Sequence, residues 1–205
     1  MQPEKIQNVV FDIGNVLVRW APEEIVRLTF TDSRPAIDLA KTLFHGDIWL
    51  DLNRGLMTEE QAKLKYQLQH GLTKLESDKL FYYVKQSLIP LYGSQELLRR
   101  VKQAGYNVYA MTDNVHEIVD YLQLHYDFWP LFDGTTVSAD LGLLKPEPGI
   151  YQSLLETHSL RAAQTVFIDD MQHNVAGAQS LGIKAIQFLD AHQCERELNM
   201  LGVQF

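Results

Sequence analysis

The sequence predicts an α/β fold in which a doubly wound parallel sheet carries a helical insertion after its first strand. From about residue 91 onward, short apolar runs typical of strands alternate with helical segments. Such alternation is typical of βαβ units, whose parallel sheet is covered by helices on both faces. Between residues 18 and 90 only helical patterns occur. We therefore expect an α/β core domain formed by residues 1–17 and 91–205, and a helical cap domain formed by residues 18–90.

The first strand is expected at Val9-Val10-Phe11, a continuous apolar run near the N-terminus. The run is broken by Ile13-Gly14-Asn15, and a short apolar run that stops at Gly and Asn is typical of a buried strand followed by a tight loop. Asp12 therefore belongs at the carboxyl end of this strand.

Helical signals fill the insertion that follows. Pro22, a favoured residue of a first helical turn, precedes apolar residues at helical spacing. A second helix is expected over residues 37–44. Thr58-Glu59-Glu60-Gln61 has the pattern of a capping box, in which the side chains at both ends of the motif bond to each other's backbone N–H groups. Ser77 is expected to open a further helix.

The last stretch supplies the rest of the predicted sheet. Ser94 is expected to open a helix that Gly105 closes, and Asn114-Val115-His116-Glu117 has a second capping-box pattern. The other expected strands are 108–111, 132–137, 165–168 and 184–187, and the other expected helices are 148–157 and 174–181.

Composition limits the class of protein. Hydrophobic residues make up 46% and charged residues 21% of the 205 residues, as in globular proteins. Cys194 is the single cysteine, which excludes a disulfide framework and a cysteine-rich zinc site. The formal net charge of −8 argues against nucleic acid or an anionic membrane as the main partner. No signal-peptide pattern or membrane-length apolar stretch is visible, so we expect a cytoplasmic protein.

Polar residues gather where the predicted strands end. Asp12 follows the first strand, Thr112-Asp113-Asn114 follows the second, and Asp169-Asp170 follows a later one. Lys145 lies in a loop just before a helix. Ligands of open parallel sheets bind outside the carboxyl ends of the strands, so these side chains should converge at one edge.

The converging residue types suit phosphate chemistry. Close carboxylates repel one another and therefore need a cation, and a set of oxygen ligands suits Mg²⁺. A lysine and a threonine add donors for an anionic oxygen. A carboxylate that remains can act as a nucleophile.

Four segments together resemble the motifs of the haloacid dehalogenase-like (HAD) hydrolase superfamily. They are residues 11–17 (Phe-Asp-Ile-Gly-Asn-Val-Leu), Thr112, Lys145-Pro146 and residues 167–170 (Phe-Ile-Asp-Asp). The predicted helical insertion lies where that superfamily places a C1 cap. The residues of these motifs are most similar to those of small sugar-phosphate phosphatases related to bacterial glucose-1-phosphate phosphatase. They also resemble those of the N-terminal phosphatase domain of soluble epoxide hydrolase.

The resemblance implies a role for each motif residue. Asp12 would attack phosphorus and become a phosphoaspartate. Mg²⁺ would be held by Asp12, the backbone carbonyl of Gly14 and Asp170, with Asp169 in support. Thr112 and the backbone N–H of Asp113 would bind phosphoryl oxygens, and Lys145 would neutralise Asp12 and the phosphate.

Gly14 departs from the superfamily pattern. Most of its phosphatases carry there a second Asp, which protonates the leaving group and later activates water. A leaving group that needs little protonation could tolerate the loss, or a cap residue such as His45 or Asp47 could replace the acid. Otherwise phosphate hydrolysis would be slow or absent.

Several further positions have two interpretations. Asn174 stands where many relatives carry Asp, and it could still bond a metal-bound water. Trp20 and Trp49 suit packing, although they could line the cap side of the pocket. Arg54 could reach a substrate, but a solvated surface position suits it better.

The favoured function is a Mg²⁺-dependent phosphatase for a small phosphomonoester, such as a hexose 1-phosphate. One alternative is a 2-haloacid dehalogenase, against which the pair Asp169-Asp170 argues, because that branch lacks an acidic pair there. The other is a weakly active or non-catalytic binding protein, which Gly14 keeps open. A monomer and a homodimer are both compatible with the sequence.

Overall fold

The computed structural model describes residues 4–30 and 35–205. Within these ranges, five parallel strands form one sheet in the order β3-β2-β1-β4-β5, which confirms the predicted doubly wound fold. The strands are β1 (Asn8–Phe11), β2 (Asn107–Thr112), β3 (Gly134–Val137), β4 (Thr165–Asp169) and β5 (Lys184–Gln187).

The central strand β1 fixes where a ligand can bind. Val9 of β1 is paired with Val108 of β2 on one side and Val166 of β4 on the other. The chain runs from β1 outward through β2 to β3, and then returns to β4 on the opposite side of β1. The strand order therefore reverses between β1 and β4, and such a switch point is where open α/β sheets bind ligands.

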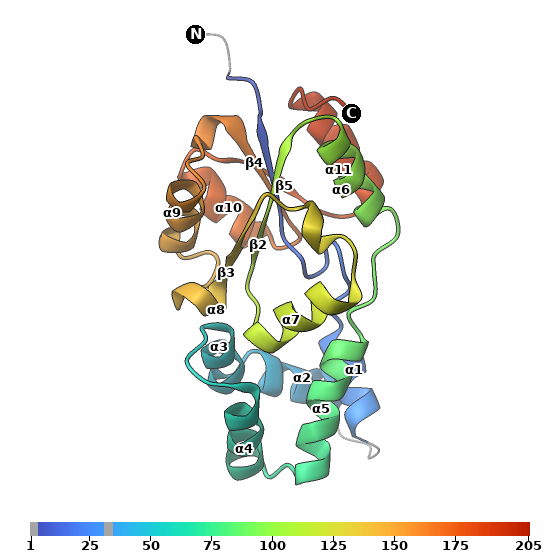
Figure 1. Ribbon diagram of the computed structural model, residues 1–205. Coiled ribbons are helices and arrows are strands. Elements are labelled where there is room, and N and C mark those ends of the chain that lie inside the picture. Colours follow the sequence, from blue (N-terminus) through green and yellow to red (C-terminus); the bar gives the residue numbers. More distant parts are fainter. Residues whose placement is uncertain (1–3, 31–34) are drawn as a thin grey trace.

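Both faces of the sheet are covered. Alternating side chains of β1 point to opposite faces, so Val9 and Phe11 belong to one apolar cluster and Val10 to the other. The helices α6 (Ser94–Gln103) and α11 (Ala191–Met200) cover the first face, and α9 (Pro148–Thr157) and α10 (Gln172–Ser180) cover the second (Figure 1).

Apart from connecting loops and an isolated bridge between Val18 and Pro90, the described residues of the insertion after β1 form helices. Its helices lie together beyond the carboxyl edge of the sheet, next to the short α8 (Ser138–Leu141) (Figure 1). Within the described ranges, no helix combines the length and the apolarity needed to cross a bilayer. The helices of the insertion are α1 (Pro22–Thr29), α2 (Ala36–Phe44), α3 (Asp47–Asn53), α4 (Glu59–His70) and α5 (Lys74–Gln86).

The predicted helix start at Ser77 is wrong, and the helix predicted over residues 174–181 is α10, which begins two residues earlier at Gln172. The helix expected to open at Ser77 is α5, which begins at Lys74 with Thr73 as its N-cap. Thr73 and Glu76 form a capping box of the same kind as Thr58 and Gln61. Ser77 lies inside the helix, where it is fully buried and its hydroxyl donates to the carbonyl of Lys74. The serine therefore fills a packing position one turn beyond the cap.

The second predicted capping box is also wrong. The helix α7 (His116–His125) begins without a side-chain cap. Asn114 Oδ1 accepts from the adjacent N–H of Val115 at 3.0 Å, and Glu117 accepts from the backbone N–H of Glu59 at 2.9 Å. A contact with α4 of the insertion has thus replaced the local box.

The capping box of α4 gives a stability test. Thr58 Oγ1 accepts from Gln61 N at 3.3 Å, and Gln61 Oε1 accepts from Thr58 N at 2.9 Å. We expect Thr58→Ala to lower the free energy of unfolding by about 1 kcal/mol, measured by urea denaturation. Thr58→Ser keeps the hydroxyl and should stay near the wild type; an equal loss in both variants would contradict the assignment.

Candidate active site

Three acidic side chains meet at the switch point of the sheet. Asp12 follows β1 directly, Asp169 ends β4, and Asp170 comes next. One carboxylate oxygen from each of the three lies within 4.8 Å of the others. The structure therefore brings together the carboxylates that the sequence predicted to converge, and it places Thr112, which is 2% exposed, at the end of the neighbouring β2.

The ammonium group of Lys145 joins two of these carboxylates. Its Nζ lies 2.9 Å from Asp12 Oδ1 and 2.7 Å from Asp169 Oδ2, and only 2% of the lysine side chain is exposed. Asp169 also accepts from Met171 N at 2.8 Å and is completely buried. Buried charges are tolerated where they are paired and hydrogen-bonded, and here Asp169 and Lys145 satisfy each other.

The pKa directions follow from this sharing. Burial penalises the charged forms of Asp12 and Lys145. It raises the pKa of Asp12 well above its usual range; the charge of Lys145 opposes this rise, and the charge of Asp169 adds to it. Burial alone would lower the pKa of Lys145, but the carboxylates of Asp12 and Asp169 outweigh it and raise that pKa. The lysine has two carboxylates while Asp12 must share one ammonium, so Lys145 remains the cation of the site.

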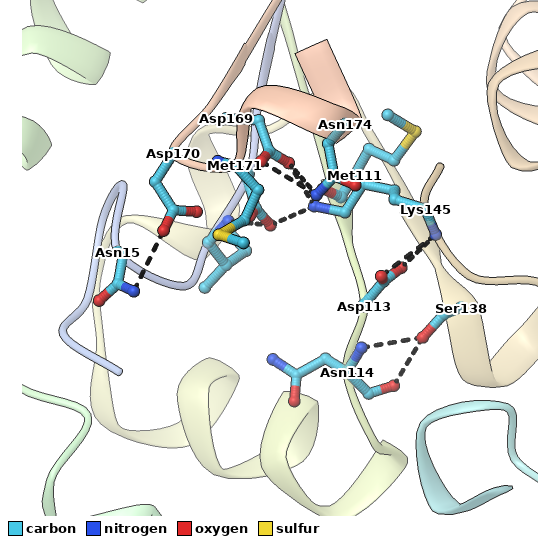
Figure 2. Close-up of polar contacts among 12 residues, drawn as sticks. Asn15, Met111, Asp113, Asn114, Ser138, Lys145, Asp169, Asp170, Met171 and Asn174 are labelled. Atoms are coloured by element: carbon cyan, nitrogen blue, oxygen red, sulfur yellow. Dashed lines mark hydrogen bonds and ion pairs between the residues drawn. The ribbon is translucent and has the colours of Figure 1, made fainter. Parts of the chain in front are cut away.

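The backbone of Lys145 is held by Asp113. Both carboxylate oxygens of Asp113 accept from the N–H of Lys145, at 3.0 and 3.1 Å (Figure 2). This contact of the Asp113 carboxylate was not predicted from the sequence, where only the backbone N–H of Asp113 was given a role. Its position directly after β2 indicated a place at the site, but no local pattern shows which backbone group a carboxylate will bind.

Asn15 connects the first loop to Asp170. Its Nδ2 donates to Asp170 Oδ2 at 3.2 Å, while its Oδ1 accepts from Trp20 N at 2.9 Å (Figure 2). The φ of Asn15 is +51°, in the left-handed region that Asn tolerates better than most residues. Burial raises the pKa of Asp170, and the hydrogen bond from Asn15 opposes that rise. In the sequence, Asn15 was recognisable as a strand breaker and as part of the motif of residues 11–17, but not as a partner of Asp170.

The side chain of Asn174 is hydrogen-bonded to Asp169. Its Nδ2 donates to Asp169 Oδ1 at 3.0 Å and to Oδ2 at 3.1 Å (Figure 2). An Asp at this position would place a second negative charge against Asp169. The Oδ1 of Asn174 is buried and has no partner among the described residues, so it can accept from a water or a ligand. The predicted bond to a metal-bound water remains a prediction.

Space remains beside Gly14. A Cβ built on Gly14 would find one described heavy atom within 4 Å outside its chain neighbours, Trp20 Cβ at 3.9 Å. The Trp20 ring stacks on Trp49 with centroids 5.5 Å apart and meets Phe44 edge-on at 5.3 Å. A Cβ at position 14 therefore meets no close contact among these atoms, and an aromatic cluster borders that position.

The two residues considered as replacement acids lie nearby in the chain. His45 follows α2 and Asp47 begins α3, and both are exposed. Their participation remains a prediction.

The residues fit a hard divalent cation. Asp169 is engaged by Lys145, Asn174 and the N–H of Met171, whereas Asp170 accepts from one other side chain, Asn15. Asp12 and Asp170 are therefore the carboxylates better placed to bind a metal, and oxygen ligands suit Mg²⁺. In the described part of the chain, none of the backbone hydrogen bonds outside helices and strands ends on the Gly14 carbonyl.

Comparison with known proteins identifies the family. The sequence pattern of haloacid dehalogenase-like hydrolases matches residues 55–188. The chain is 30% identical to a sesquiterpene phosphatase of Aspergillus oryzae, covering 94% of each protein, and 26% identical to a drimenol cyclase of Aspergillus calidoustus, of which it spans 37%. A HAD family enzyme of Bacteroides thetaiotaomicron, crystallised with magnesium and inorganic phosphate, shares the fold at a TM-score of 0.75 and 24% identity, over 90% of this chain and 95% of that one.

This chain therefore belongs to the haloacid dehalogenase-like hydrolase family. The resemblance predicted from the four motifs is confirmed at the level of the superfamily, and the protein is a hydrolase. The finer likeness to glucose-1-phosphate phosphatase stays a prediction.

Removing the buried cation tests the electrostatics of the site. Lys145→Met leaves Asp12 and Asp169 without their shared ammonium, and we expect it to lower the free energy of unfolding by about 3 kcal/mol near neutral pH. An acid whose folded pKa is raised destabilises the fold when it ionises, so protonation on acidification relieves that cost. The deficit should therefore shrink between about pH 7.5 and about pH 5.5.

The measurement is chemical denaturation in EDTA at both pH values. Lys102→Met removes a surface lysine, which lies 2.5 Å from Asp133, and serves as the control. A Lys145→Met variant as stable as this control at both pH values would contradict the account.

Proposed function

We propose that this hydrolase is a Mg²⁺-dependent phosphatase that cleaves a small phosphomonoester through a phosphoaspartate at Asp12. The observation that carries the proposal is the Lys145 ammonium 2.9 Å from Asp12, with the acidic pair Asp169-Asp170 beside them. The full-length similarity to a protein named as a phosphatase supports it, as does a neighbour crystallised with magnesium and phosphate.

The nucleophile is oriented by its own hydrogen bonds. Asp12 Oδ1 accepts from Ile13 N at 2.7 Å and from Lys145, which leaves Oδ2 to attack phosphorus. A bond forms between Oδ2 and phosphorus while the bond from phosphorus to the leaving oxygen breaks, and that oxygen keeps the electron pair. The leaving oxygen then takes a proton from water. A second water attacks phosphorus and loses a proton to solvent, the bond between phosphorus and Oδ2 breaks, inorganic phosphate leaves, and the Asp12 carboxylate is regenerated.

The surrounding residues stabilise the charge on the phosphoryl group. Lys145 supplies its ammonium, and Thr112 with the backbone N–H of Asp113 supplies neutral donors. Asp12, the Gly14 carbonyl and Asp170 would hold Mg²⁺, with Asp169 in support. When bound, the ion supplies positive charge against the phosphate oxygens.

Gly14 and the aromatic cluster favour two substrate types. Without an acid at position 14, a leaving group with a relatively acidic hydroxyl, such as the anomeric oxygen of a hexose 1-phosphate, reacts most easily. A second candidate is the phosphate of an apolar alcohol. Trp20, Trp49 and Phe44 beside Gly14 favour it, as does the similarity to a sesquiterpene phosphatase.

The domain division belongs to the same proposal. Residues 18–90 would act as a cap that closes over the phosphate site, and residues 1–17 and 91–205 as the catalytic core. Closure of such a cap excludes water and selects the substrate. The dehalogenase alternative is disfavoured by the acidic pair, and the non-catalytic alternative by the complete set of Asp12, Lys145 and Asp170.

Phosphate release tests the proposal. The panel contains hexose 1-phosphates, hexose 6-phosphates, prenyl monophosphates and p-nitrophenyl phosphate, each with Mg²⁺ and with EDTA. We expect release that requires Mg²⁺ and that is lost in Asp12→Asn, which keeps the shape of the side chain but removes its nucleophilic charge. No release above the Asp12→Asn background from any compound would overturn the phosphatase proposal.

Restoring an acid at position 14 probes the leaving group. A Cβ at position 14 would lie no closer than 3.9 Å to Trp20 Cβ, and general acid catalysis is worth on the order of 10²–10⁴-fold. We expect at least a tenfold gain in kcat with an unactivated alkyl phosphate, since its leaving oxygen needs a proton. The rate with p-nitrophenyl phosphate, whose leaving group needs none, should change little. Gly14→Asn serves as a control of similar size, and equal gains in both variants would contradict an acid role.

A further inference from the structure

The end of helix α3 rests on the loops that carry the site residues. The backbone carbonyl of Asn53 accepts from Ser138 Oγ at 2.6 Å, and the same hydroxyl accepts from Asn114 N at 2.9 Å. Asn114 directly follows Thr112 and Asp113. One serine at the start of α8 therefore connects the helical insertion to the loop after β2.

The next turn of chain packs closely against α8. Gly55 has a φ of +68°, and a Cβ added to it would lie 2.2 Å from the carbonyl oxygen of Ala139. Any side chain at position 55 would push the insertion away from α8. The backbone itself thus forms the contact between the two parts.

Arg54, between these residues, binds the loop that carries Lys145. Its Nη1 donates to the Gly142 carbonyl at 2.8 Å, and its guanidinium forms an ion pair with both carboxylate oxygens of Glu147. The side chains of Arg54 and Glu147 are 29% and 38% exposed. The flat fork of an arginine suits such two-point binding of a carboxylate. The solvated surface position predicted for Arg54 is therefore wrong, because the residue is bonded to the core.

Glu147 and Lys145 share one turn. The N–H of Glu147 donates to the Leu144 carbonyl at 2.8 Å and closes the turn, while the N–H of Lys145 is held by Asp113. The turn is thus bound by Asp113 of the core on one side and by Arg54 of the insertion on the other. The ion pair between Arg54 and Glu147 therefore links the position of the insertion to the position of the Lys145 backbone.

We propose that Arg54 is a positioning residue, which aligns Lys145 by docking the helical insertion on the turn of residues 144–147. The inference rests on the proposed phosphatase function for its effect on rate, but the docking itself does not. A partly exposed ion pair contributes little to global stability, whereas small displacements of a catalytic group reduce rates strongly. The pair therefore acts mainly on alignment.

The kinetic test compares four variants. With the best substrate of the panel, we expect Arg54→Ala to reduce kcat about three- to tenfold, with a smaller change in KM, and Arg54→Lys to recover part of the loss. R54E should be at least as impaired as R54A, and the R54E/E147R double variant should be more active than R54E. The thermal midpoint, measured with and without Mg²⁺, should stay near wild type in Arg54→Ala.

Hydrogen exchange gives a readout that needs no substrate. We expect backbone amides of residues 142–150 to exchange faster in Arg54→Ala than in wild type. Arg99→Ala is the matched control. The Arg99 side chain is 31% exposed, and its guanidinium lies 2.6 Å from a carboxylate oxygen of Asp127, a residue outside the turn. This variant should change neither exchange in residues 142–150 nor kcat.

The outcomes separate the two proposals. A wild type that releases no phosphate, together with faster exchange in Arg54→Ala, would overturn the phosphatase function and retain the docking contact. Unchanged exchange and unchanged kcat in Arg54→Ala would overturn the positioning role. A fall in kcat that only follows a fall in the thermal midpoint would overturn it as well, because it would show a purely structural effect.

Discussion

The buried ammonium of Lys145 is the interaction on which the rest of this site depends. It lies 2.9 Å from Asp12 and 2.7 Å from Asp169, at the point where the strand order of the sheet reverses. A charge removed from water must be compensated by nearby opposite charge, so β1 and β4 have to bring their terminal carboxylates to the same place. The loop before α9 must in turn reach this place from the outside of the sheet.

The charge balance explains why the site suits both a metal and a phosphate. With all three carboxylates ionised, Asp12, Asp169 and Asp170 outnumber the single ammonium by two negative charges. A divalent cation removes that surplus, and the resulting site can accept a phosphate dianion. Asp169 is bound to Lys145 and Asn174 and thereby orients the lysine, whereas Asp12 and Asp170 are the carboxylates proposed to bind the metal. The two acids of the pair Asp169-Asp170 therefore have different partners.

Much of this arrangement could be predicted from the sequence because parallel sheets obey simple rules. Residues that follow buried strands meet at one edge, which is why Asp12 and Asp169-Asp170 were expected together and why the structure places them within reach of one cation. The limits of α9 and β5 were also expected as observed. For α9, a proline at the helix start is a strong local signal.

Contacts between distant segments could not be predicted from the sequence. Glu117 gave a capping-box pattern but binds the N–H of Glu59, and Arg54 binds Glu147, which is 93 residues away. A partly exposed arginine and a glutamate carry no periodic pattern that reveals such a pairing. The same holds for the carboxylate of Asp113, whose choice of the Lys145 N–H depends on the fold of the loop. Local patterns therefore located the residues of the candidate site but not the contacts that hold them in place.

The central claim is that Asp12 carries the phosphoryl group during turnover. Acid quenching during the reaction, followed by mass spectrometry of the peptides, tests it most directly, because an acyl phosphate survives brief acid treatment. The account predicts a phosphoryl group on the peptide that contains Asp12. It should be present only when Mg²⁺ is added and the enzyme is turning over a substrate. Steady phosphate release with no phosphorylated peptide, or with the phosphoryl group on another residue, would contradict it.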